Sequence, residues 1–464
     1  MLRPLASILV VLLLLAACGG GDEGGSDAST TSQATTSTSA VEADASTTTS
    51  ADTTTTTPEP TTTTTASATT DGSTTTTEAA EPVTEADETD WLTIAAGVTI
   101  VGFEGENASA SNGVRAIDGE PTQIGFSNDA SEPVVYVFEL PAPTTFTAFS
   151  IPDTRNSPGN TTFFGSVEVA GSNTGPEEGF EVLVSNDFVE LDEGQEAAHF
   201  TPSTSTPVRW IRLTLSGALH VEHEPGKTVV RFTELIGQGA QDPVPMGDRF
   251  NGVWELAFLD NPDGSGDLTQ LRQDGSRVSG CIGFAMVNGT VTGNVVRLNG
   301  IDTRNDRPSA YLFVVGDDGR LRGMESTNNG VFRARIGRVS PEGTTTPCSQ
   351  SEPEPIACGS VVYVNFDVNS ATIRPDSTQV LDDLYEDLGA QEATVVGHTS
   401  TEGDADHNQD LSERRAQAVV DELVARGMPA DQISSEGRGE TEPLVRESDE
   451  ASRSINRRVE IACG

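Results

Sequence analysis

Three arginines near the end of the chain have the chemistry of a site for an acidic ligand. The 464-residue sequence carries 27 Lys and Arg against 71 Asp and Glu, a formal net charge of −44. Such a charge excludes binding to nucleic acid or anionic lipid by bulk attraction. Arg415, Arg457 and Arg458 are local positive groups on this background. Because a guanidinium can donate two parallel hydrogen bonds to a carboxylate, we expect a carboxylate-binding pocket here.

Two amphipathic helices are predicted around these arginines. The first covers residues 375–388, where the apolar side chains fall on one face. The second carries Arg415 and ends at Gly427, with Pro429 beyond it. Helices that alternate with strands indicate a compact α/β sandwich of roughly a hundred residues. The predicted strands are residues 361–366, 394–396, 433–437 and 458–461.

Five short motifs follow one another in the C-terminal region, residues 357–464. They are Asn365-Phe366-Asp367, Gly397-His398-Thr399, Asn408-x-x-Leu411-Ser412-x-x-Arg415-Ala416, Gly437-x-Gly439-Glu440 and Asn456-Arg457-Arg458-Val459. Together they resemble the OmpA-like, peptidoglycan-associated domain. The resemblance implies that this region binds, without covalent chemistry, the diaminopimelate in the peptide stem of peptidoglycan.

The resemblance also implies roles for single residues. Arg415 matches the arginine that binds the ligand carboxylate in this family. Ser400 stands at the position where the family has an aspartate, which binds the ligand ammonium. A hydroxyl supplies no countercharge, so we expect weaker binding of a zwitterion unless Glu402, Asp404 or Asp406 compensates. The alternative is that Arg415 only pairs with a loop carboxylate in a structural module. The residues predicted to surround peptidoglycan are Asn369, Ser400, Asn408, Arg415 and Arg457.

The start of the chain predicts export. Residues 1–18 comprise Arg3, an apolar run too short to span a membrane, and Leu15-Ala16-Ala17-Cys18. The last four resemble a lipobox, which implies a lipid on Cys18 and a membrane partner; an ordinary secretory signal is the alternative. Residues 19–89 are Thr, Ser, Ala, Gly and acids. We predict a disordered tether with a reach of roughly 45–50 Å.

Residues 90–240 are predicted to form an all-β sandwich, because short apolar runs are punctuated by Gly, Pro, Ser and Asn. The predicted strands are residues 134–140, 146–151, 167–170, 181–184, 209–215 and 229–236. Four short motifs in this region support a resemblance to a known family. They are Phe138-Glu139-Leu140-Pro141, Val169-Ala170-Gly171-Ser172-Asn173, Arg209-Trp210-Ile211-Arg212-Leu213 and Glu234-Leu235-Ile236-Gly237. They resemble the discoidin family of galactose-binding-like jelly rolls.

The discoidin-like resemblance implies a glycan as a candidate partner and calcium as a candidate structural ion. The resemblance implies Asp118 and Glu234 as the acidic calcium ligands. Backbone carbonyl oxygens would have to complete the coordination shell of the ion. Trp210 alternates with apolar residues and is expected in the core. Phe163 and Phe164 are better candidates for an exposed surface that stacks on sugar, although we favour a buried loop anchor.

Residues 246–340 are predicted to be a second β-rich unit, in which hairpin follows hairpin. Tight turns are expected at residues 263–264, 274–275, 288–289 and 318–319. The predicted strands are residues 254–259, 267–273, 277–282, 290–298, 311–315, 321–324 and 331–338. This pattern indicates an up-and-down sheet or small barrel. Phe250-Asn251-Gly252-Val253-Trp254 near its start, with Arg333 or Arg335 near its end, resembles a lipocalin-type barrel. We favour a structural spacer with a filled core, joined to the C-terminal region by a linker at residues 341–356.

The cysteine count indicates two disulfides. With Cys18 lipidated, four cysteines remain in an exported chain, and three pairings are open. The OmpA-like fold is expected to place its last strand beside its first. This resemblance implies Cys358–Cys463, and Cys281 would then pair with Cys348. The cysteines and histidines show no metal-ligand spacing.

The sequence as a whole predicts a lipid-anchored, multidomain protein of the cell envelope that binds peptidoglycan. Its membrane is either an outer membrane or the outer face of the cell membrane. No catalytic step is implied, since residues 246–340, the only part free to be catalytic, contain no His and no Gly-x-Ser-x-Gly elbow. One alternative is an adhesin or carbohydrate-binding protein that uses the C-terminal region as a structural anchor. The other is a wall hydrolase with targeting modules.

Overall fold

The computed structural model describes residues 89–463 apart from seven short gaps, at residues 106–107, 128–131, 154–160, 189–190, 192–194, 220–228 and 349–352. The predicted signal segment, the lipidation of Cys18 and the tether therefore lie outside the described residues. Residues 79–464 cluster as one unit. None of the helices in the described ranges combines the length and the apolar character that crossing a membrane requires.

The region between residues 90 and 241 is built on two β-sheets. Its elements are η1 (Ile94–Ala96), β1 (Thr99–Glu104), α1 (Ala110–Arg115), β2 (Ile124–Ser127), β3 (Val134–Pro152), β4 (Thr161–Phe163), β5 (Ser166–Ser172), β6 (Glu181–Asp187), β7 (Ala197–Phe200), β8 (Val208–Ser216), β9 (Val229–Phe232) and β10 (Ile236–Gln241). Among the described residues, the larger sheet has seven strands and is entirely antiparallel, while β2, β9 and β4 form a second sheet.

The long strand β3 organises the larger sheet, because it pairs with β1, β7, β8 and β10. Alternate residues such as Tyr136, Phe138 and Phe149 are buried, as expected where one face of a sheet covers a core. The two strands predicted at residues 134–140 and 146–151 are therefore one strand. A register shift against β8 marks the stretch that interrupted the apolar pattern. Conversely, the single strand predicted at residues 229–236 is two strands.

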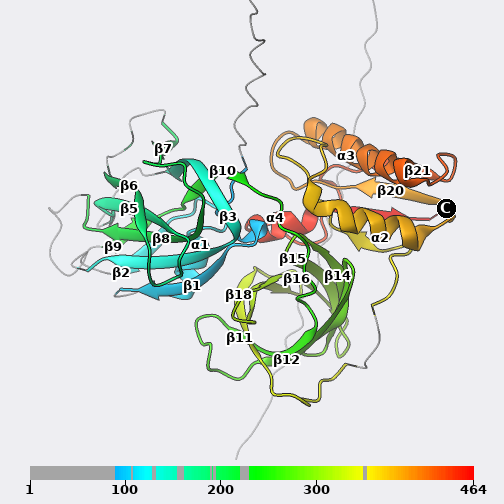
Figure 1. Cartoon of the computed structure of the whole chain (residues 1–464), viewed down its shortest axis with the longest axis horizontal. Helices are drawn as coiled ribbons and strands as arrows, with labels where there is room; N and C mark the ends of the chain where they lie inside the picture. The colour runs from blue at the N-terminus through cyan, green and yellow to red at the C-terminus, as the bar shows by residue number, and fades with distance from the viewer. Residues whose placement is uncertain are drawn as a thin grey trace, which may run out of the picture. The chain divides into compact units, whose positions relative to one another are not determined.

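The middle region is a closed antiparallel barrel of eight strands in chain order, all of them described (Figure 1). The strands are β11 (Gly252–Phe258), β12 (Asp267–Asp274), β13 (Arg277–Ile282), β14 (Ala285–Thr292), β15 (Val295–Asp302), β16 (Arg307–Val315), β17 (Leu321–Thr327) and β18 (Arg333–Val339). A cluster of buried side chains that includes Trp254, Leu271 and Phe313 packs within this region. Of the two predicted alternatives, an up-and-down sheet or a small barrel, the structure shows the barrel.

One predicted hairpin of the barrel is wrong. Asn288 and Gly289 lie inside β14, opposite Asn299 and Leu298 of β15. The turn comes four residues later at Gly293, where φ is +61°. The predicted strand at residues 290–298 therefore spans the end of one strand and the start of the next. Adding a Cβ to Gly289 would bring it onto the backbone of β15, so this glycine serves close strand pairing and not a turn.

The C-terminal region is a four-stranded sheet with helices, with strand order β19-β22-β20-β21 among the described residues. Its elements are β19 (Val361–Val362), η2 (Pro375–Ser377), α2 (Thr378–Leu388), β20 (Ala393–Gly397), α3 (Ala405–Arg426), β21 (Ile433–Gly437), α4 (Glu450–Asn456) and β22 (Val459–Ala462). Both predicted helices are present. The predicted first strand is shorter than expected, because Thr290 and Thr292 of the barrel hydrogen-bond the backbone of Tyr363 instead.

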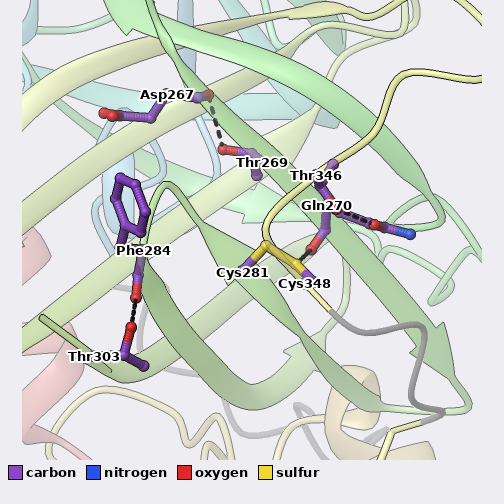
Figure 2. The surroundings of a disulfide bond; sticks show 8 residues. All are labelled: Asp267, Thr269, Gln270, Cys281, Phe284, Thr303, Thr346 and Cys348. Atoms are coloured by element: carbon purple, nitrogen blue, oxygen red, sulfur yellow. Dashed lines mark hydrogen bonds between the residues drawn. A yellow bond between two sulfur atoms is a disulfide. The ribbon is translucent and has the colours of Figure 1, made fainter.

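The barrel and the C-terminal sheet each have one disulfide. Cys281 of β13 pairs with Cys348, and Cys358 pairs with Cys463, with Cα atoms 5.6 and 5.5 Å apart. Figure 2 shows Cys348 beside β12, where Thr346 also contacts the Gln270 side chain. Both predicted pairings are confirmed. The second one matters for the sheet, because β19 and β22 share only two residue pairs.

Candidate functional site

A cavity of about 470 Å³ lies where the five predicted residues meet. This volume is within the usual range of small-molecule sites. Its walls come from the C-terminal region, from residues 89–96, from the β14–β15 turn, and from Gly119, Glu234 and residues between 236 and 244. The predicted residues that line it are Asn369, Ser400, Asn408, Arg415 and Arg457.

Arg415 projects from α3 and is a buried cation without an anion. The residue is only 9% exposed, and its guanidinium lies 4.9 Å from the centre of the Phe366 ring. Nε donates to the Ser370 carbonyl (2.9 Å) and Nη2 to that of Asp367 (3.4 Å). No carboxylate among the described residues forms an ion pair with it. Burial, followed by repulsion from Arg457, lowers the pKa of Arg415 to about 10.

The position of Arg415 depends on close packing between α3 and β20. Gly397, the last residue of β20, lies directly under the helix, and a Cβ there would overlap the Ser412 carbonyl oxygen. At the start of α3, the Asp404 side chain accepts from the backbone N–H groups of Asp406 and His407. This is a helix N-cap. The Gly-His-Thr motif and the loop after it therefore position the helix that presents the arginine.

Asn408 holds the loop that carries Ser400. Its side-chain nitrogen donates to the carbonyl oxygens of Ser400 (3.3 Å) and Glu402 (2.9 Å), and to Glu440 (2.7 Å). The residue is buried. Asn408 is thus a positioning residue in this structure, with its donor group already engaged by protein acceptors.

Of the three acids that could replace the missing aspartate, only Glu402 lines the cavity. Its carboxylate lies 3.2 Å from Nε of Arg453 and 3.9 Å from Nη1 of Arg457. The Glu402 side chain is 60% exposed, which puts it at the rim. Asp404 is engaged as the N-cap and Asp406 is exposed in the first turn of α3.

The short helix α4 supplies three cavity residues that the sequence did not indicate, Glu450, Arg453 and Ser454. Arg453 contacts Glu450 (2.9 Å) and Glu120, and donates to the Gly119 carbonyl (2.6 Å). Glu450 also pairs with Arg457. Burial opposes ionisation of Glu450, but the two arginines outweigh it and lower its pKa. The signal that could have found Arg453 is its place one turn before the Asn-Arg-Arg-Val motif.

The two acids predicted to bind calcium both accept hydrogen bonds from backbone N–H groups of the turn at Gly119. Glu234 is buried and accepts from the Gly119 N–H, while Asp118 accepts from that of Glu120 (3.0 Å). Burial raises the pKa of Glu234 to about 8 and that of Asp118 to about 7. Within the described ranges, no group of three or more His, Cys, Asp or Glu is arranged to hold a metal ion. Calcium at this pair stays a prediction.

The aromatic residues considered for sugar stacking are placed differently from one another. Phe163 and Phe164 are buried, and Phe164 packs edge-on against Phe126 at 5.3 Å. The loop-anchor interpretation is confirmed and the exposed surface is wrong. Trp210 is half-buried beside Arg209, because the inward face of β8 carries Ile211 and the alternate residues after it. The prediction of a core tryptophan is therefore wrong.

Comparison with known proteins identifies similarity mainly at the C-terminal end. Residues 365–457 match the OmpA family. Outer membrane protein A of Klebsiella aerogenes is 46% identical over 87 residues, which cover 18% of this chain and 25% of that protein. The chain thus spans about a quarter of the length of that relative.

Two solved structures are each similar to a part of the chain. The peptidoglycan-associated lipoprotein from Burkholderia pseudomallei is 26% identical and covers 22% of this chain and 87% of that chain, with a TM-score of 0.20. A family 32 CBM from C. perfringens NanJ, solved with galactose, is 16% identical. It covers 32% of this chain and 98% of that chain, with a TM-score of 0.23.

Proposed function

We propose that the OmpA family domain at residues 365–457 attaches this protein non-covalently to peptidoglycan, by binding the diaminopimelate of the stem peptide beside Arg415. The observation that carries the proposal is the buried guanidinium without an anionic partner among the described residues. Leaving a charge buried and uncompensated is strongly unfavourable. A ligand carboxylate would restore the balance and use the donor atoms that Ser370 and Asp367 leave free.

The ammonium group of the ligand needs a negative partner, and Glu402 is our candidate. It lies at the rim of the same cavity, whereas Ser400 offers only a hydroxyl. Glu402 is shared with Arg453 and Arg457, so its charge is already partly compensated. We therefore expect this domain to bind diaminopimelate more weakly than relatives that have the aspartate.

The proposed binding site implies a location in the cell envelope. The relative from Klebsiella aerogenes is an outer membrane protein by name. For this chain we propose export and anchoring through a lipid on Cys18, with residues 19–89 as the tether that lets the domain reach the wall. No covalent step is part of the proposal.

Co-sedimentation of the mature chain with purified wall sacculi tests the site. We expect Arg415→Ala to weaken pelleting at least tenfold, since a hydrogen-bonded charge pair contributes about 1.5–3 kcal/mol. Arg414→Ala is the matched control, because Arg414 is exposed and pairs only with Asp410 (2.7 Å). Ser400→Asp should tighten binding several-fold by supplying the missing charge. Equal pelleting of all four proteins would contradict the proposal.

The two rival functions make different predictions in the same preparation. A wall hydrolase would release soluble muropeptides from the sacculi, and we expect none. An adhesin would bind glycans through residues 90–240 and would do so equally well in the Arg415→Ala variant. Retention on a glycan array together with unchanged sacculus binding in that variant would favour the adhesin.

A further inference from the structure

The cavity extends beyond the OmpA family domain, and the barrel forms part of its wall. The β14–β15 hairpin contributes residues from Thr292 to Arg297, which meet the C-terminal region at Tyr363. Thr292 Oγ1 donates to the Tyr363 carbonyl (2.6 Å), and Asn299 donates to the Tyr363 hydroxyl (2.7 Å). The contact between the barrel and the site is therefore made of specific hydrogen bonds.

Arg297 of β15 is a second buried guanidinium at this cavity. The residue is 5% exposed. Nε donates to Ser454 Oγ (2.7 Å), Nη2 donates to the Ala95 carbonyl (3.3 Å), and the guanidinium lies 5.8 Å from the Tyr363 ring centre. Nη1 is buried and has no hydrogen-bond partner in the described part of the chain. No described carboxylate forms an ion pair with Arg297.

Several other buried polar atoms at the same cavity also lack hydrogen-bond partners among the described residues, although Nε2 of His398 lies 3.7 Å from the Glu460 carboxylate. They belong to Thr93 (Oγ1), Asp376 (Oδ1), His398 (both ring nitrogens) and Thr399 (Oγ1). Buried polar groups in folded proteins are nearly always hydrogen-bonded. Their concentration around one cavity, from separate stretches of the chain, therefore points to a polar occupant that extends past Arg415.

Arg297 and Arg415, which have no ion-pair partner among the described residues, line the same cavity. Burial is the largest cause that lowers the pKa of Arg297 to about 10, and repulsion from Arg457 is the next. Arg457 acts in the same direction on Arg415. Arg457 itself pairs with Glu450. Among the described residues, Arg297 and Arg415 thus line the cavity without an ion-pair partner, whereas Arg457 has one.

We propose that Arg297 binds a second carboxylate of the same stem peptide, so that the site recognises a dicarboxylate and the barrel is part of it. The inference rests on the proposed function. A stem that ends at diaminopimelate carries two free carboxylates on that residue, and Arg415 accounts for one of them. The Nε and Nη2 atoms of Arg297 hold the barrel to α4 and η1, which leaves Nη1 for the ligand.

The test compares two soluble tripeptides that end in diaminopimelate, one with a free C-terminal carboxylate and one amidated there. Calorimetric titration of the full mature chain should give at least tenfold tighter binding of the free acid. Arg297→Gln should reduce this preference to less than about threefold, because it should weaken binding of the free acid far more than binding of the amide. Arg297→Lys, which keeps the charge, should retain part of the preference. Arg304→Gln is the control, because this barrel arginine is 58% exposed and pairs with Asp302.

The outcomes separate this inference from the proposed function. A purely structural role of Arg297 would weaken both tripeptides equally in the Gln and Lys variants, and that result would overturn the inference. Unchanged binding of both tripeptides by Arg415→Ala would overturn the proposed function instead. Wild-type binding without preference for the free acid would also exclude a second carboxylate site.

Discussion

Arg414 and Arg415 are adjacent in the sequence but differ in exposure and in their partners. Arg414 is exposed on α3 and pairs with Asp410 one turn earlier. Arg415 points into the protein and meets only carbonyl oxygens and the Phe366 ring. An exposed ion pair of the first kind contributes little to stability or recognition. A buried guanidinium without an anion, as at Arg415, is energetically unfavourable. Burial therefore determines the chemistry that we propose for this site.

Burial also makes the stability of the protein depend on pH through Glu234. Its pKa rises from 4.5 to about 8, so between these values the folded state holds a proton that the unfolded state has released. Stability is then greatest below pH 4.5 and falls as pH rises through 8, by at most about 1.4 kcal/mol per pH unit for this group. Glu234→Gln, whose amide oxygen can still accept from the Gly119 N–H, should flatten this slope.

Urea unfolding at pH 5 and pH 8, in the presence of a chelator, measures the effect. An equal slope in wild type and Glu234→Gln would show that this carboxyl is not the cause. Repeating the series with calcium tests the predicted ion at Asp118 and Glu234. Bound calcium would favour the ionised acids and so remove the wild-type loss of stability at pH 8.

At the scale of the elements, the site depends on how closely α3 approaches β20. Gly397 ends the strand directly beneath Ser412, one turn before Arg415. Ser412 Oγ in turn accepts from the Gly439 N–H (2.9 Å), which ties the helix to the loop after β21. The helix and the sheet therefore meet through backbone contact at Gly397, with no room for a side chain.

Gly397→Ala should push α3 away from the sheet and shift Arg415 with it. We expect a loss of about 1–3 kcal/mol in the free energy of unfolding, as is typical of an overpacked contact. Sacculus binding should weaken even where the protein stays folded. Gly175→Ala is the control, because nothing lies within 4 Å of a Cβ at that position. Similar unfolding curves for the two variants would contradict this account of the packing.

At the scale of the whole unit, the barrel and the C-terminal region share buried polar contacts. Asp383 of α2 accepts hydrogen bonds from Ser276 of the barrel, including one of 2.6 Å from its hydroxyl. Arg277 pairs with Asp387 at 2.6 Å. These contacts hold the two regions on either side of the chain that leads into Tyr363. The walls of the cavity therefore depend on both.

Asp383→Ala should destabilise the protein by about 1–3 kcal/mol, because it leaves the buried Ser276 N–H without its acceptor. Asp382→Ala is the matched control, since Asp382 is 52% exposed and pairs with Arg426 on the surface. Urea unfolding of both variants checks the difference. If the contact between the regions is not maintained in solution, the two substitutions will have equal and small effects.

The sequence by itself determined the features that depend on local patterns. The helix face of residues 375–388, the helix that carries Arg415, and three hairpin turns of the barrel follow from periodicity and turn residues. The resemblance of the motifs added both disulfides. The failures are also local in origin. Asn288-Gly289 has the composition of a turn but lies within β14, and α4 is too short to show a helical period.

Only the tertiary structure decided which charged groups have partners. Arg297 and Ser454 are 157 residues apart in the chain, and their hydrogen bond brings the barrel to the edge of the cavity. The sequence shows that Arg297, Arg415, Arg453 and Arg457 are all cations. It does not show that two of them are buried without an anion while the other two are neutralised, because pairing depends on long-range contacts and on exclusion of water. That distinction is what supports the proposal of a site for an acidic ligand.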